Sequence, residues 1–214
     1  MEALVDNDIV MKGACYDLLD EMLSQIVSST DLLGILGAAR FVVAKKIRKS
    51  ALKRDKEDAI GSLEAFIQRV TVVEPTTDEQ LLAADFELAA QRAGVALDIG
   101  ESQLCAVLLA RAVPQLYTGD KRAIHAMQEL LEVDTRLRPL CGKVRCLEQL
   151  VLQSITEGNC SRLRAAVCAE PKVDLALTIC FSCSSSDVSL EDISYALNSY
   201  INDLRRGAQQ ILAN

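Results

Sequence analysis

Three short apolar runs in the first 135 residues are typical of buried strands. They cover residues 3–5, 70–73 and 115–118, and each ends in polar or turn-forming residues. Between them the apolar residues follow helical spacing, over residues 9–26, 32–53, 58–69, 77–92, 101–112 and 121–132. A short strand near residues 41–43 is an open alternative within the second stretch. Strands that alternate with helices predict an α/β fold, in which helices cover both faces of a parallel sheet.

The pattern changes after Pro139. Helical spacing recurs over residues 144–155, 161–169, 173–181 and 190–212, and no strand pattern is evident there. Ser189, followed three residues later by Asp192, resembles a helix-capping arrangement. We therefore predict two parts: a sheet domain over residues 1–139, and an all-helical C-terminal extension over residues 140–214.

Composition is that of a globular protein and predicts neither a membrane span nor an export signal. Half of the 214 residues are hydrophobic, yet no uncharged apolar run is long enough to cross a bilayer. The first residues lack the basic start and long apolar region of a signal peptide. We therefore expect a cytoplasmic protein whose eight cysteines are reduced thiols. Cys180 and Cys183 have C-x-x-C spacing, which we interpret as packed thiols, because a structural zinc site needs four ligands.

Charge is distributed unevenly along the chain, whose formal net charge is −7. Seven basic residues and one acid lie between Lys45 and Lys56, so this segment carries +6 and the remainder carries −13. Such a segment can bind the phosphate backbone of RNA, and the alternative is a plain solvated helix face. The RNA-binding candidates in it are Lys45, Lys46, Arg48, Lys49 and Lys53.

Three carboxylates are expected at one edge of the predicted sheet. Asp6 and Asp120 each follow a strand, and Glu101 begins a helix that must run antiparallel to the strands. Open α/β sheets bind ligands at this edge. Carboxylates that converge repel one another, and Mg²⁺ or Mn²⁺ would relieve the repulsion. The structural alternative is that each acid only ends a strand or caps a helix. The single histidine, His125, excludes a metal site built on several histidines.

The segments around these acids resemble motifs of the PIN-like nuclease family. The opening strand and first acid of that family resemble residues 4–9 (LVDNDI). Its G-E-x-x-x-x-A helix start is similar to residues 98–106 (DIGESQLCA), and its strand ending in T-x-D-[KR] is similar to residues 116–123 (LYTGDKRA). The order and the intervals also match, so the resemblance covers residues 1–135.

This resemblance implies a three-layer PIN-like domain and a metal-dependent endoribonuclease. Asp6, Glu101 and Asp120 would hold Mg²⁺ or Mn²⁺, and metal-activated water would cleave the RNA phosphodiester bond. Many bacterial members of the family are toxins, so a toxin-type or defence-type effector with an inhibitory protein partner is also implied. The supporting candidates are Asp8, Asp98, Lys12 and Lys121.

One departure from the family pattern favours a different function. The family usually carries another acid at the start of the helix after its second apolar segment, where this chain has Lys45 and Lys46. The alternative is therefore a catalytically impaired PIN-like module that binds RNA or a protein partner. The resemblance is silent on residues 140–214, for which a further hypothesis is a homodimer interface formed by the C-terminal helices.

Overall fold

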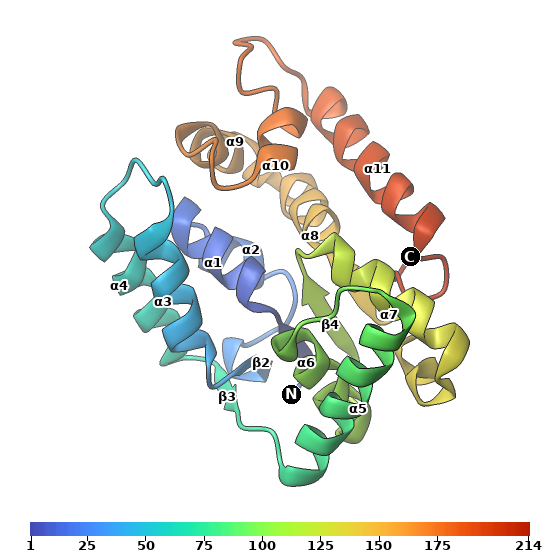
Figure 1. Ribbon diagram of the computed structural model, residues 1–214. Helices are drawn as coiled ribbons and strands as arrows, with labels where there is room; N and C mark the ends of the chain where they lie inside the picture. The colour runs from blue at the N-terminus through green and yellow to red at the C-terminus, as the bar shows by residue number, and fades with distance from the viewer.

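Five parallel strands form one sheet at the centre of the molecule (Figure 1). This computed structural model describes residues 1–214 except for the side chain of Glu157. The strands are β1 (Ala3–Val5), β2 (Leu33–Leu36), β3 (Thr71–Val73), β4 (Gln115–Thr118) and β5 (Val144–Cys146). Their order is β3-β2-β1-β4-β5. The order reverses between β1 and β4, and such a reversal leaves a crevice at the carboxyl ends of the two strands.

Helices lie against both faces of this sheet (Figure 1). One face is covered by α1 (Asn7–Tyr16), α2 (Leu19–Leu23), α3 (Ala39–Lys49), α4 (Lys56–Ile67) and α8 (Leu147–Ser154). The other is covered by α5 (Thr77–Ala93), α6 (Ile99–Ala110) and α7 (Lys121–Val133). The remaining helices are α9 (Cys160–Ala169), α10 (Leu175–Cys180) and α11 (Leu190–Gly207). Short helical turns occupy Thr30–Leu32, Thr135–Leu140 and Ile155–Asn159.

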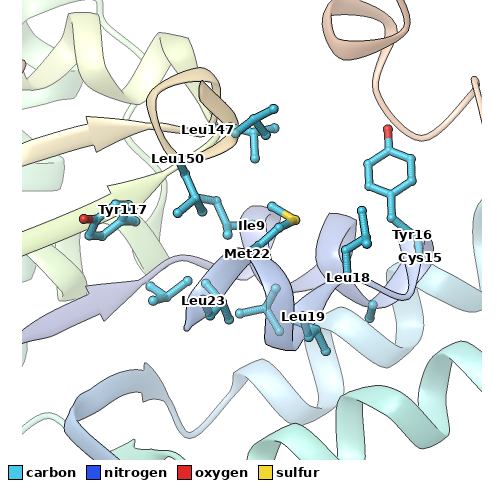
Figure 2. Packing of buried hydrophobic residues seen from close by; sticks show 14 of the residues in the cluster. Ile9, Cys15, Tyr16, Leu18, Leu19, Met22, Leu23, Tyr117, Leu147 and Leu150 are labelled. Carbon is cyan, nitrogen blue, oxygen red and sulfur yellow. The ribbon is translucent and has the colours of Figure 1, made fainter. Parts of the chain in front are cut away.

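Successive side chains of a strand enter different cores, because they point to opposite faces of the sheet. Ala3 and Val5 of β1 pack in the core beside α1, whereas Leu4 packs in the core beside α6. Figure 2 shows the first core, in which α8 contributes Leu147 and Leu150. The prediction of an α/β fold with a parallel sheet covered on both faces is confirmed.

The segment predicted as one helical stretch over residues 32–53 contains a strand. Residues 33–36 form β2, and α3 begins only at Ala39. The open alternative of a strand near residues 41–43 is wrong, because these residues lie within α3. The sequence of β2 is LGIL, and all four residues are buried. A continuous apolar run of this length fits a buried strand and a buried helical turn equally well.

Two other local predictions need correction. The helix expected over residues 9–26 is divided into α1 and α2, because Asp17 adopts the left-handed conformation with φ 58° and ends α1. The run over residues 70–73 does form a parallel strand, but β3 lies at the edge of the sheet and not in its interior. Thr71 and Val72 are consequently exposed.

The prediction of an all-helical region over residues 140–214 is wrong, because β5 lies within it. Val144 of β5 pairs with Leu116 of β4, and the backbone N–H of Ala213 donates to the carbonyl oxygen of Val144 at 2.8 Å. Three residues with an arginine in the middle are too short to show strand periodicity. The end of the chain and β5 therefore extend the sheet that the first 139 residues begin.

Two of the cysteines form a disulfide bond, which corrects the prediction of eight reduced thiols. Cys168, at the end of α9, is bonded to Cys183, after α10, with a Cα–Cα distance of 5.0 Å. Cys180 is a buried free thiol, so the C-x-x-C pair does not act as a unit. Spacing along the sequence does not reveal which two cysteines the fold brings together.

None of the helices in the described part of the chain is both long enough and apolar enough to pass through a membrane.

Candidate functional site

A pocket of about 260 Å³ lies at the crevice where the strand order reverses. Asp6 directly follows β1, and Asp120 follows β4 after one glycine. Because β1 and β4 are paired in parallel, their carboxyl ends meet at one edge of the sheet. The amino end of α6 reaches the same edge, as its direction in the fold requires. Five carboxylate side chains line the pocket: Asp6, Asp8, Asp98, Glu101 and Asp120.

Asp6 is held rigidly at the bottom of this arrangement. It is the N-cap of α1, and its side chain accepts hydrogen bonds from the backbone N–H of Asn7 at 2.6 Å and from the hydroxyl of Thr118 at 3.1 Å. Burial and the negative charge of Asp8 raise the pKa of Asp6 to about 6, despite these two hydrogen bonds. An ionised Asp6 is therefore under electrostatic stress that a nearby cation would relieve.

Glu101 forms a capping box with Asp98 at the start of α6. The backbone N–H of Asp98 donates to Oε2 of Glu101 at 2.9 Å, and the backbone N–H of Glu101 donates to Oδ1 of Asp98 at 3.0 Å. Burial raises the pKa of Glu101 to about 8, and the charges of Asp98, Asp120 and Asp6 act in the same direction. The prediction that Glu101 begins the helix is therefore close, since the residue lies in the first turn of α6.

Asp120 differs from the other two acids because it has a cationic partner. It is the N-cap of α7, and the guanidinium of Arg122 donates to its Oδ2 at 2.7 Å. Burial alone would raise the pKa of Asp120, but the hydrogen bonds from the side chain and backbone of Arg122 outweigh burial and lower it. Arg122 also lines the pocket, although the sequence analysis did not select it. Its position two residues after a predicted helix cap is the signal that could have found it.

Asp8 connects the pocket to a buried lysine. The ammonium of Lys12 lies 2.6 Å from Asp8 and 2.7 Å from Asp174, which precedes α10. Burial would lower the pKa of Lys12, but the two negative charges outweigh burial and raise it. A Cβ atom at position 119 would collide with the carboxylate of Asp8, so a larger residue there would force the side chain of Asp8 to move. Lys12, one of the two supporting lysines, thus forms an ion pair with a residue that lines the pocket.

The second supporting lysine, Lys121, turns away from the pocket. Its ammonium lies 2.7 Å from a carboxylate oxygen of the buried Glu148 in α8 and 4.6 Å from the ring centre of Tyr200 in α11. Burial would lower the pKa of Lys121, and the hydrogen bond to Glu148 outweighs burial and raises it. Lys121 thus joins α7 to the C-terminal helices.

The basic segment is exposed and begins at the pocket itself. Lys46 lines the pocket together with the acids, and it lies on α3. The other RNA-binding candidates are exposed on α3 or just after it, and among the described residues none of them forms an ion pair: Lys45, Arg48, Lys49 and Lys53. Five exposed basic side chains without ion pairs to any described residue therefore lie on or just after the helix that reaches the acidic pocket.

The ligand atoms and the net negative charge of the pocket suit a hard cation, but the side chains are not arranged to coordinate one. Five carboxylates face two cationic side chains there, and carboxylate oxygens are the ligands that Mg²⁺ and Mn²⁺ prefer. In the part of the chain that the structure describes, no three His, Cys, Asp or Glu side chains are grouped so that they could hold a metal ion as they stand. The capping box of Glu101 and the ion pair of Asp120 each occupy an oxygen of these carboxylates. Side chains of the pocket would have to move before three of them could share a cation.

Comparison with known proteins adds no family assignment, because neither a protein-family model nor a curated protein matches the chain. The class that the fold itself defines is an α/β protein with an acidic pocket at the carboxyl ends of its central parallel strands.

Proposed function

We propose that the protein is a divalent-cation-dependent ribonuclease of the PIN-like type. The observation that supports this most is the pocket that five carboxylates line, at the carboxyl ends of β1 and β4. Two of these acids, Asp6 and Glu101, have raised pKa values, as expected where negative charges are buried without cationic partners.

Asp6, Glu101 and Asp120 would hold the cation, which we expect to be Mg²⁺ or Mn²⁺. When bound, such an ion orients a water molecule, lowers the pKa of that water and neutralises charge that develops on the phosphodiester. Thr118 keeps Asp6 directed into the pocket through its hydroxyl group. Arg122 would exchange Asp120 for a phosphate oxygen, because a guanidinium binds either anion through paired N–H donors.

RNA would approach along the basic segment. Lys46 is placed where it can contact a phosphate beside the pocket, and Lys49 and Lys53 follow it as exposed side chains. Each phosphate that these side chains neutralise releases condensed counterions, so binding should weaken steeply with salt concentration. Protein regions of opposite charge would thus have separate tasks: the acidic side chains would hold the cation, and the basic side chains would hold the phosphate backbone of the RNA.

The test of this proposal is cleavage of single-stranded RNA in the presence of Mn²⁺, with and without EDTA. We expect cleavage by the wild type, suppression by EDTA, and loss of cleavage in Asp6→Asn. A matched control is Asp134→Asn, because Asp134 is also a partly buried helix cap but pairs with Arg136 away from the pocket. Cleavage that survives both EDTA and Asp6→Asn would overturn the mechanism.

A second candidate is a PIN-like module that binds RNA without cleaving it. It is favoured by two cationic side chains in the pocket, because Lys46 and Arg122 compensate part of the negative charge that a metal ion would otherwise compensate. RNA binding that needs no divalent cation, together with no turnover of the RNA, would identify this candidate.

The proposed homodimer through the C-terminal helices stays a prediction. The apolar side of α11 is already covered within the chain, since Ile193, Leu197 and Ile201 are buried. Its opposite side carries Tyr195, which is 80% exposed. Sedimentation of the full chain would test the dimer, and a monomeric mass would count against it. An inhibitory protein partner likewise stays a prediction.

A further inference from the structure

The loop between α9 and α10, residues 170–174, reaches back to both parts of the proposed RNA-binding site. Its first residue, Glu170, is only 5% exposed and contacts the basic segment. Its two carboxylate oxygens accept hydrogen bonds from the backbone N–H groups of Lys53 at 2.8 Å and Arg54 at 2.6 Å. These partners lie 117 and 116 residues earlier in the sequence. Glu170 therefore fixes the backbone of the basic segment where it leaves α3.

The last residue of the loop, Asp174, is linked to the acidic pocket through Lys12. Its Oδ2 lies 2.7 Å from the ammonium of Lys12, and that ammonium lies 2.6 Å from Asp8, which lines the pocket. The side chains of Lys12 and Asp174 are 10% and 12% exposed. A buried lysine is stable only when it is paired, so Asp174 and Asp8 together determine where the charge of Lys12 lies.

The loop is itself held at both ends and across its middle. The disulfide bond between Cys168 and Cys183 encloses it together with α10. Oδ1 of Asp174 accepts a hydrogen bond from the backbone N–H of Leu177 at 2.8 Å and caps α10. The hydroxyl of Thr178 donates to the carbonyl oxygen of Pro171 at 2.9 Å. A loop restrained in this way can impose its position on the segments that it contacts.

We propose that the α9–α10 loop positions the RNA-binding side of the acidic pocket, with Glu170 fixing the basic segment and Asp174 fixing Lys12 against Asp8. Glu170 and Asp174 are positioning residues, since they act through Lys53, Arg54 and Lys12. This inference rests on the proposed ribonuclease function, and it gives the C-terminal region a task in that function. Packing alone does not require the two buried acids to meet the basic segment and the pocket.

The test compares two variants of the full chain with two matched controls. Glu170→Gln replaces one acceptor oxygen by a donor, so it should loosen the basic segment and raise KM for single-stranded RNA. Asp174→Asn keeps the cap of α10, because asparagine caps helices as well as aspartate does, and removes only the charge that faces Lys12. The controls are Glu79→Gln and Asp134→Asn, which alter a buried glutamate and a capping aspartate with arginine partners elsewhere.

We expect Glu170→Gln to raise KM about tenfold with little change in kcat, the scale of one lost hydrogen bond to a charged group. Asp174→Asn should lower kcat about tenfold with little change in KM, because the pocket and not the basic segment is disturbed. Both controls should keep the wild-type KM and kcat. The split between KM and kcat is a result that a merely structural role of the loop would not produce.

Three outcomes would count against the inference, and they are distinguishable. An active wild type whose Glu170→Gln and Asp174→Asn variants match the controls would overturn the positioning role and leave the ribonuclease proposal intact. A similar rise in KM and fall in kcat in both variants, together with lowered thermal midpoints, would also overturn it, because such changes indicate general destabilisation. A wild type that neither binds nor cleaves RNA would overturn the proposed function and the positioning role together. If Glu170→Gln fails to fold, Asp174→Asn still decides the outcome, since it keeps its helix cap.

Discussion

Glu79 and Glu101 occupy equivalent positions in neighbouring helices and have opposite electrostatics. Each is the third residue of its helix, each forms a capping box, and each is buried, with exposures of 4% and 6%. Arg111 binds both oxygens of Glu79, and its hydrogen bonds lower the pKa of that glutamate. Burial raises the pKa of Glu101 to about 8, and acidic neighbours contribute. One local motif therefore serves two purposes, and only the surroundings of the carboxylate separate a structural acid from a candidate catalytic acid.

When each of these two glutamates is replaced by glutamine, the largest expected difference between the variants is in activity. Glu101→Gln should lower kcat/KM for RNA about 100-fold, the scale of removing one group that stabilises charge in the transition state. Glu79→Gln should leave kcat/KM unchanged, because Glu79 faces Arg111 and not the pocket. Cleavage assays on the two variants in parallel measure the difference. Equal activities of the two variants would show that the equivalence of the two glutamates extends to function.

The next largest difference is in stability, and here Glu79→Gln is the variant that is affected. Glu79→Gln should lower the free energy of unfolding by about 2 kcal/mol, because it weakens charged hydrogen bonds and leaves Arg111 without its anionic partner. Glu101→Gln should not lower the free energy of unfolding at neutral pH, since a carboxyl with a pKa of about 8 is mostly protonated there and glutamine is an uncharged side chain of the same shape. Urea denaturation of both variants measures this. A larger loss of stability in Glu101→Gln would contradict the comparison.

The pH dependence of stability sharpens the comparison further. The folded state holds the proton of Glu101 up to a pKa of about 8, against an ordinary value of 4.5, so it binds more protons than the unfolded state between these pH values. The contribution of Glu101 to stability is therefore complete below about pH 4.5 and is lost as the pH rises through about 8. Asp6 acts in the same direction, between 3.8 and about 6.

Thermal midpoints of the wild type and Glu101→Gln at pH 5, 6.5 and 8 would reveal this difference. The advantage of the wild type over the variant should shrink as the pH rises, and added Mn²⁺ should restore part of it at pH 8. A wild-type advantage that grows from pH 5 to pH 8 without a divalent cation would show that Glu101 is not a repelled acid.

Asp120 lies between the two cases and gives the smallest expected effect. It faces the pocket as Glu101 does, yet it has an arginine partner as Glu79 does. Arg122→Gln should free its carboxylate and tighten Mn²⁺ binding about threefold, because an exposed ion pair is weak. Titration calorimetry measures this change. Weaker binding of Mn²⁺ by the variant would indicate that Arg122 supports the site instead of competing for Asp120.

The sequence predicted the parts of the fold that rest on long or well-marked patterns. β1, β4 and the helices α5, α6 and α7 lie within two residues of their predicted ranges, because a side-chain cap begins each of these helices and Gly94 ends α5. From these elements it followed that Asp6, Glu101 and Asp120 should reach one edge of the sheet, and all three line one pocket there. Topology alone carried that part of the prediction.

Other features depend on contacts that a sequence does not display. β2 and β5 have four and three residues, which is too short for a period of two to be recognised. The pairing of Cys168 with Cys183 and the bonds of Glu170 to the basic segment join positions that only the folded chain brings together. The sequence likewise does not show that Asp120 and Glu79 have arginine partners whereas Glu101 has none among the described residues.

The most direct test of the shared cation site is a crystal of the protein soaked in Mn²⁺ and measured for anomalous scattering. We predict a peak in the pocket among Asp6, Glu101 and Asp120, with Glu101 turned away from the backbone of Asp98. A pocket without an anomalous peak, with Glu101 still in its capping box, would contradict the account.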